Sequence, residues 1–237
     1  MKKSITLIFF TLIMALSACA PQAKAVPTQL PSDEPTTIVK TPIPEAPTAM
    51  PDVPTTKSYT NNDFGFSFRY PADWFGPDEY ISDQTLRLAV GSDVVYPYGE
   101  PPDEPSDVKN SYIVVIQYMK NNQNNFYNDT YESLMDMQDG ESLSGTRSLI
   151  TRVRKIQMGR FEGFEYTSTL SETAQTEIVF AREILLLDTQ SNDLLTVSGQ
   201  PNNVEVAEGA NWREVYQALD QANLALFEGI VESITAE

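Results

Sequence analysis

The chain has 237 residues, of which 16 are basic, 33 acidic, one is cysteine and none is histidine, so its formal net charge at pH 7 is −17. Nucleic-acid-binding proteins need a positive face to displace counterions, so a protein this acidic is a poor candidate for that class. The lack of histidine excludes Ser-His-Asp hydrolysis and nearly all zinc and copper sites, and a lone cysteine excludes an intramolecular disulfide.

The first 18 residues have the composition of an export signal peptide. Two lysines near the amino terminus precede residues 5–16 (ITLIFFTLIMAL), which are apolar except for two threonines. These twelve residues are too few to cross a membrane, because a spanning helix needs roughly 20 apolar residues. A short apolar run behind a positive end is typical of a cleaved signal sequence.

The cysteine follows directly, in the stretch Leu16-Ser17-Ala18-Cys19. This stretch resembles the lipobox of bacterial lipoproteins. The resemblance implies that a diacylglyceryl group is attached to the Cys19 sulfur and that residues 1–18 are removed. The mature protein would then be anchored to the bacterial cell membrane, facing away from the cytoplasm, since two or more acyl chains hold a protein stably to a bilayer. The alternative is an ordinary secretory signal cut after Ala20.

Residues 19–57, which start at the lipid-bearing Cys19, are predicted to form a tether. Between 20 and 57 the sequence holds nine prolines, seven threonines and no aromatic residue. Proline fixes φ and has no amide donor, so neither helix nor sheet propagates here. A segment of this composition buries too little apolar surface to offset its ordering entropy. We expect a disordered, extended spacer, and its composition leaves open whether it carries O-linked sugar.

Residues 58–237 are long enough for one domain with a sizeable core, and they hold 29 of the 33 acidic residues. Strands dominate the predicted structure. At 64–71 aromatic residues alternate with small or polar ones, which indicates one buried face. Residues 111–119 are apolar on both faces, as in a central strand covered on each side. The expected strands are 64–71, 86–90, 111–119, 151–158, 163–170, 177–188 and 193–199, with a turn through Gly159 and Gly163 joining 151–158 to 163–170.

Two helices are predicted. Asp129 with Glu132 is a cap-like start for a helix over 130–138, and Asn211 with Glu214 opens a longer helix over 212–234. In the second helix an apolar stripe that includes Trp212 is expected to face the core, with Asp220 on the polar side. Strands separated by turns, with helices near the middle and end, predict an α+β fold in which helices cover an antiparallel sheet.

The segments FSFRYPADWF (66–75) and FEGIVESI (227–234) resemble the PsbP-like family, related to the extrinsic oxygen-evolving-complex protein. The family pattern is an aromatic strand ending in Tyr-Pro, a nearby Trp and a closing helix. Here Tyr70, Pro71 and Trp74 take these positions. The resemblance implies an antiparallel sheet with helices on both faces, an α/β/α sandwich. It implies no reaction, and Trp74 is expected to be a packing residue.

No catalytic or cofactor-binding residue is assigned from the sequence. The loop 97–107 gathers acidic side chains that are weak candidates for a Ca²⁺ site, but their spacing fits no EF-hand and four prolines hinder wrapping around an ion. A solvated acidic loop is therefore favoured over a metal site. The acidic residues in question are Glu100, Asp103, Glu104 and Asp107.

Other local patterns are weaker still. Ser106 and Lys109 match Ser-x-x-Lys, but they lie in a polar, proline-bounded stretch rather than at a buried helix start. Basic residues between Arg147 and Arg160 are read as a solvated strand face, or else as a docking patch for an acidic partner.

Three functional hypotheses follow from these features. The favoured one is a membrane-anchored, non-enzymatic binding or assembly module whose partner is an envelope protein or a small ligand. The anchor, the spacer and the lack of a catalytic constellation are its basis. The alternatives are a carboxylate-based envelope hydrolase and an acidic, Ca²⁺-responsive binding module at 97–107.

Overall fold

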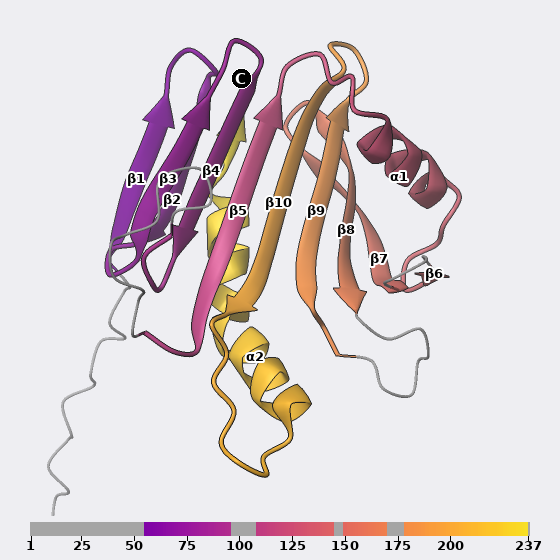
Figure 1. The fold of residues 1–237 in the computed structure, drawn as a ribbon. Helices are drawn as coiled ribbons and strands as arrows, with labels where there is room; N and C mark the ends of the chain where they lie inside the picture. The colour runs from indigo at the N-terminus through magenta and orange to yellow at the C-terminus, as the bar shows by residue number, and fades with distance from the viewer. Residues whose placement is uncertain (1–54, 96–107, 145–148, 170–177, 237) are drawn as a thin grey trace, which may run out of the picture. The chain divides into compact units, whose positions relative to one another are not determined.

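The computed structural model describes residues 55–95, 108–144, 149–169 and 178–236 (Figure 1). These residues belong to a compact unit that spans Pro51–Glu237. The first strand begins at Thr56, two residues before the expected start of the domain. The predicted signal peptide, Cys19 and the tether up to residue 54 lie outside the described residues, and so does the acidic loop 97–107.

Most elements of the described chain are β-strands. In chain order the elements are β1 (Thr56–Asn61), β2 (Phe66–Pro71), β3 (Phe75–Ile81), β4 (Thr85–Gly91), β5 (Ser111–Met119), α1 (Asn125–Met135), β6 (Leu143–Ser144), β7 (Leu149–Met158), β8 (Phe161–Thr169), β9 (Ala181–Asp188), β10 (Asp193–Asn202), α2 (Trp212–Glu232) and β11 (Thr235–Ala236). The predicted strand over 111–119 is confirmed residue for residue, and the other expected strands are confirmed with shifted ends.

The strands form two antiparallel sheets. The larger has eight strands in the order β3-β4-β5-β10-β9-β8-β7-β6, and the smaller has three in the order β1-β2-β11. In the larger sheet β9 pairs with β8 on one side and with β10 on the other. In the smaller sheet the last strand, β11, pairs with β2 near the start of the domain.

The inner face of the larger sheet carries the main core. Alternate residues of β4, β5, β9 and β10 meet the aromatic face of β2 and the apolar stripe of α2. Phe66 and Phe68 of β2 and Phe227 of α2 are almost fully buried here. Phe227 lies against Gly199 of β10, where a Cβ atom would collide with its ring. The predicted aromatic face of 64–71 is therefore confirmed as a core face.

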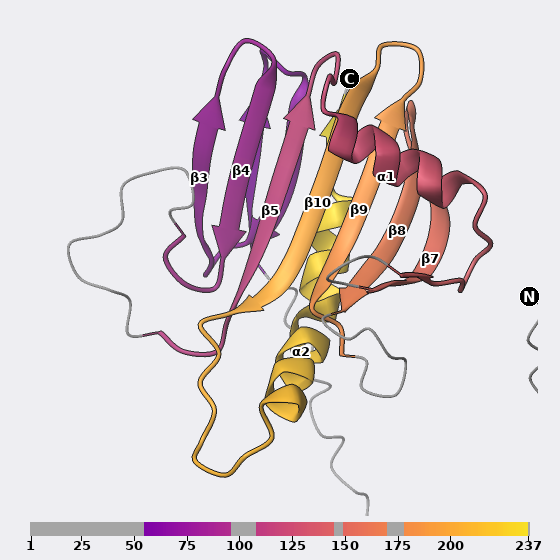
Figure 2. The same ribbon diagram turned by 45° about the vertical axis from the view of Figure 1, so that its right-hand side comes forward.

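The outer face of the same sheet carries a smaller core beneath α1, formed by Tyr131 and Leu134 of α1 with Phe164 of β8 and Leu185 of β9. Both views show α1 on one face of the larger sheet and α2 on the opposite face, where it contacts β5 and β10 (Figures 1 and 2). The predicted α+β fold, an antiparallel sheet with helices on both faces, is thus confirmed.

The two helices correct three sequence predictions, one about a boundary and two about which side chains are buried. Helix α1 begins at Asn125, because the Asn124 side chain accepts a hydrogen bond from the Phe126 amide at 3.0 Å; Asp129 lies inside the helix and does not cap it. Helix α2 is capped by Asn211 as expected. However, Trp212 at its start is exposed, and Asp220, expected on the polar side, is buried.

Asp220 is buried because it forms an ion pair with Arg182 of β9. The Arg182 Nε lies 2.9 Å from Asp220 Oδ1, and its Nη2 lies 2.7 Å from Asp220 Oδ2. The two side chains are 11% and 1% exposed. A bidentate pair of this kind fixes the position of α2 on the inner face of the sheet.

The sequence also predicted a packing role for Trp74 and a turn position for Gly163. Trp74 is buried and packs at 6.4 Å, ring to ring, against Tyr112 of β5, so its expected packing role is confirmed. Gly163, by contrast, lies within β8 and not in the turn. A Cβ atom on Gly163 would collide with the main-chain carbonyl of Leu185, so the close approach of β9 requires glycine there.

Candidate functional site

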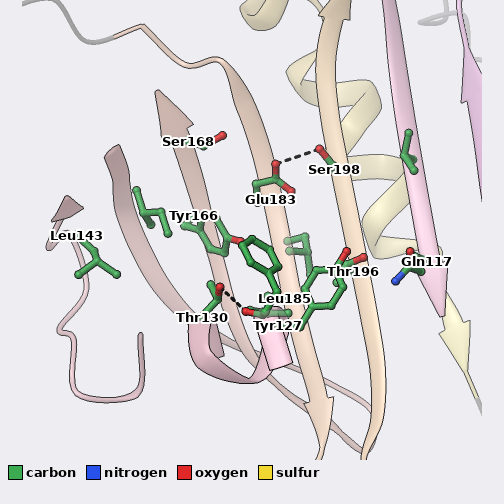
Figure 3. A pocket seen from close by; sticks show the side chains of 14 residues that line it. Gln117, Tyr127, Thr130, Leu143, Tyr166, Ser168, Glu183, Leu185, Thr196 and Ser198 are labelled. Atoms are coloured by element: carbon green, nitrogen blue, oxygen red, sulfur yellow. Dashed lines mark hydrogen bonds between the residues drawn. The ribbon is translucent and has the colours of Figure 1, made fainter. Parts of the chain in front are cut away.

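A pocket opens on the outer face of the larger sheet, beside α1 (Figure 3). Its volume is about 600 Å³, within the range of about 300–1,000 Å³ that is common for small-molecule sites. Strands β5, β8, β9 and β10 form its floor, and α1 and Leu143 of β6 contribute to its wall. The polar side chains on the floor are Gln117, Tyr166, Ser168, Glu183, Thr196 and Ser198.

Glu183 lies in the middle of this floor because of the strand register. On β9 it stands opposite Tyr166 of β8 and Ser198 of β10, so the three side chains share the outer face. The Ser198 hydroxyl donates a hydrogen bond of 3.1 Å to Glu183 Oε1 (Figure 3). Burial raises the pKa of Glu183 from 4.5 to about 7, and the hydrogen bond from Ser198 opposes this shift only in part.

The neighbouring arginine does not neutralise this carboxylate. Successive side chains of a strand point to opposite faces, so Arg182 points to the inner face, where it pairs with Asp220. Among the described residues that line the pocket, Glu183 is the only one with an ionisable carboxyl or basic group. The pocket thus presents a single desolvated carboxyl group beside hydroxyl and amide groups.

The wall of the pocket is aromatic and apolar. Phe126 and Tyr127 come from the first turn of α1, with their rings 5.5 Å apart in an edge-to-face arrangement, and Phe126 is 69% exposed. The Asn124 cap fixes where this turn begins. The Thr130 hydroxyl, one turn further along α1, donates a hydrogen bond of 2.8 Å to the Phe126 carbonyl. An exposed aromatic ring at the rim of a polar floor is suited to contact a bound molecule.

A second polar cluster joins β8 to the β9–β10 turn. The guanidinium of Arg160 lies 3.3 Å from Asp188 and 2.9 Å from Asp193, and it donates a hydrogen bond of 2.8 Å to the Tyr118 hydroxyl. Tyr118 in turn donates to Asp193 at 2.8 Å. Hydrogen bonds from the Gln190 amide and the Ser191 hydroxyl lower the pKa of Asp188. Each member has a partner within the cluster, which is typical of a structural network.

Three of the four described basic residues between Arg147 and Arg160 have partners within the domain, and the fourth, Arg152, is exposed. Arg154 pairs with Glu165, Lys155 donates to the Met135 carbonyl, and Arg160 belongs to the cluster above. Arg147 lies outside the described residues. The basic side chains of this strand face are thus not only solvated, as expected, but in part bound to partners within the domain.

The predicted site residues lie elsewhere in the chain. Cys19 and the weak Ca²⁺ candidates Glu100, Asp103, Glu104 and Asp107 fall outside the described residues. Within the described ranges, no cluster of three or more acidic or cysteine side chains is arranged to hold a metal ion. In those same ranges neither helix has the length and hydropathy needed to span a membrane.

No protein-family model matches the chain, and no curated protein matches it. The fold is similar to a solved structure, the solution structure of cyanobacterial PsbP from Synechocystis sp. PCC 6803. The similarity covers 78% of this chain and 94% of that one, with 11% identity and a TM-score of 0.29. At this level it establishes no function. The α+β architecture rests on the strand pairing and helix positions themselves.

Replacing Glu183 with glutamine is expected to change the pH dependence of stability. Between about pH 4.5 and pH 7 the native state binds more protons at Glu183 than the unfolded chain, so the wild type loses stability as pH rises through this window. Glutamine removes this loss and can still accept the Ser198 hydrogen bond. After allowance for partial exposure, we expect the free energy of unfolding of the variant to exceed that of the wild type by about 1 kcal/mol or more at pH 8. At pH 4 the two free energies of unfolding should be equal.

Urea unfolding at both pH values measures this difference. Glu162→Gln makes the same chemical change at an exposed position of β8, and it should stay within about 0.5 kcal/mol of the wild type at either pH. A Glu183→Gln effect of equal size at pH 4 and pH 8 would contradict the assigned titration.

Proposed function

We propose that the protein is a membrane-anchored bacterial lipoprotein whose extracytoplasmic domain is a non-enzymatic binding module. The observation that carries this proposal is the pocket on the outer face of the larger sheet. It combines an apolar and aromatic wall with a few convergent polar groups, as small-molecule sites do. The lipobox-like sequence at Cys19 and the proline-rich segment behind it support the anchored location.

The composition of the pocket favours binding over hydrolysis. Glycoside hydrolysis uses two carboxyl groups across the scissile bond, and the described lining residues supply one, Glu183. The polar groups beside Glu183 are hydroxyls and an amide, which orient a ligand through hydrogen bonds. The chain has no histidine to act as a general base beside them.

A bulky side chain in the floor of the pocket tests this function. Thr196 of β10 lines the pocket, and tryptophan at this position is expected to fill it. The full-length wild-type protein, isolated from the bacterium that makes it, should carry a small molecule in native mass spectrometry, and Thr196→Trp should not. The ligand should also raise the wild-type Tm by about 5 °C or more at about 100 times its Kd.

Thr60→Trp is the matched control, because Thr60 is exposed on β1 in the smaller sheet. This variant should retain the ligand. Equal retention of the ligand by Thr196→Trp would mean that the molecule is bound elsewhere, and the pocket would lose its assigned role.

A further inference from the structure

We propose that the Glu183 pocket selects organic cations, namely an amine or methylated ammonium group on an apolar body. This inference rests on the proposed binding function and assigns the chemical class of its ligand. The cationic group would lie against the Glu183 carboxylate, and the apolar body would lie along the aromatic wall from α1.

The first argument is the charge of the pocket. On the floor, Glu183 faces Tyr166 and Ser168 from β8, Ser198 and Thr196 from β10, and Gln117 from β5. From α1 it faces Phe126, Tyr127 and Thr130, and from β7 it faces Ile150. Of the described residues facing it, the only other titratable groups are the two tyrosines. Burial raises the pKa of Tyr166 above its usual value, so this hydroxyl stays neutral. A carboxylate is therefore present without a basic side chain to pair with it.

The basic side chains on the surrounding strands are engaged elsewhere. Lys155 of β7, two strands from β9, donates a hydrogen bond of 3.0 Å to the Met135 carbonyl. Arg182 pairs with Asp220 on the inner face. Arg87 of β4 shares the outer face, opposite Gln117 of β5, but its guanidinium lies 5.8 Å from the ring centroid of Tyr80. It is also three strands from β9, about 14 Å at about 4.8 Å per strand. A bound cation would thus supply the counter-charge that the protein does not.

The second argument is the aromatic wall. Phe126 and Tyr127 stand at the rim, and Tyr166 contributes a third ring beside Glu183. Aromatic faces attract ammonium groups, and the attraction grows when water is excluded. Leu185 and Ile150 offer apolar surface next to these rings. A carboxylate within an aromatic and aliphatic enclosure is complementary to a cation that carries a hydrocarbon body.

The cationic ligand also makes binding depend on pH. The carboxylate form of Glu183 pairs with the cation, and its free-state pKa of about 7 means that the protonated form dominates at lower pH. Binding therefore releases a proton below pH 7. Affinity should be highest above pH 7 and should fall by about tenfold between pH 8 and pH 6.

The test compares matched probes on the full-length protein by isothermal titration calorimetry. The probes are 2-phenylethylamine, its neutral analogue 2-phenylethanol, and the anion 3-phenylpropionate. At pH 8 the amine should bind at least about tenfold more tightly than the alcohol, and the anion should not bind at about 10 mM. In Glu183→Gln the preference for the amine should disappear while weak alcohol binding remains. Glu162→Gln should keep the wild-type preference.

The outcomes separate this inference from the proposed function. If the alcohol binds as tightly as the amine, or the amine preference survives in Glu183→Gln, cation selection by Glu183 is overturned and the pocket remains a binding site. If the amine binds with the same affinity at pH 6 and pH 8, the inference is also overturned. If no probe binds at about 10 mM, it is overturned, and the native mass spectrometry of Thr196→Trp decides the proposed function independently.

Discussion

Replacing Arg182 with methionine is expected to lower the free energy of unfolding by about 3–5 kcal/mol. The reason is the partner left behind. Asp220 is 1% exposed, and both of its carboxylate oxygens accept hydrogen bonds from the Arg182 guanidinium. Without Arg182, a charged carboxylate would remain between α2 and the larger sheet with only a longer hydrogen bond, 3.3 Å, from Gln221. Urea unfolding followed by tryptophan fluorescence measures the loss.

Two controls separate burial from simple loss of an arginine. Arg154→Met breaks a second arginine–carboxylate pair, with Glu165, but the Arg154 side chain is 63% exposed, so the cost should be below about 1 kcal/mol. The double variant Arg182→Met/Asp220→Leu removes both buried charges and should recover most of the loss. Equal costs for the two arginine substitutions would show that the Arg182–Asp220 pair is not desolvated.

Replacing Cys19 with serine is expected to abolish attachment of the protein to the membrane. A hydroxyl cannot take the place of the sulfur that is proposed to carry the diacylglyceryl group, and hydrocarbon chains supply about 0.8 kcal/mol of membrane affinity per buried CH₂. Acyl labelling of cells that produce the variant should therefore find no labelled protein. The variant should remain as the uncleaved precursor or appear in the soluble fraction.

Thr28→Ser is the control for this experiment, because it makes a small change in the same proline-rich segment without touching the cysteine. It should be labelled and sediment with membranes as the wild type does. A Cys19→Ser protein that stays membrane-bound at the mature mass would overturn the lipoprotein assignment, while the pocket and its ligand would be unaffected.

The strands with strong local patterns were the ones that the sequence predicted well. Residues 111–119 are apolar throughout and form the central strand β5, and the aromatic alternation after Phe64 marks the core face of β2. The strands β1 and β3 were missed because they are polar edge strands, and Pro77 interrupts β3. Edge strands gain their structure from pairing with a neighbour, which local sequence does not record.

The candidate site was not predicted because it depends on register. Glu183 lies in a stretch, AREILLLD, that reads as an ordinary buried strand. Only the pairing of β9 with β8 and β10 places Glu183 between Tyr166 and Ser198. The same limit applies to Asp220, whose buried position follows from Arg182, 38 residues away in sequence. The asparagines before α1 did carry a usable signal, since Asn124 is a favoured N-cap residue.

The pairing of β11 with β2 also constrains when the domain can fold. Thr235 and Ser67 share a hydrogen bond of 2.7 Å across 168 residues of sequence, and the Ser233 hydroxyl accepts a hydrogen bond from the Arg69 amide at 2.8 Å. The smaller sheet is therefore incomplete until the ribosome has synthesised residue 235. Contacts this distant in sequence slow folding, because the chain must close a long loop before the contact forms. If the proposed signal peptide directs the chain through an export channel, the smaller sheet would be completed only after residue 235 has left the channel.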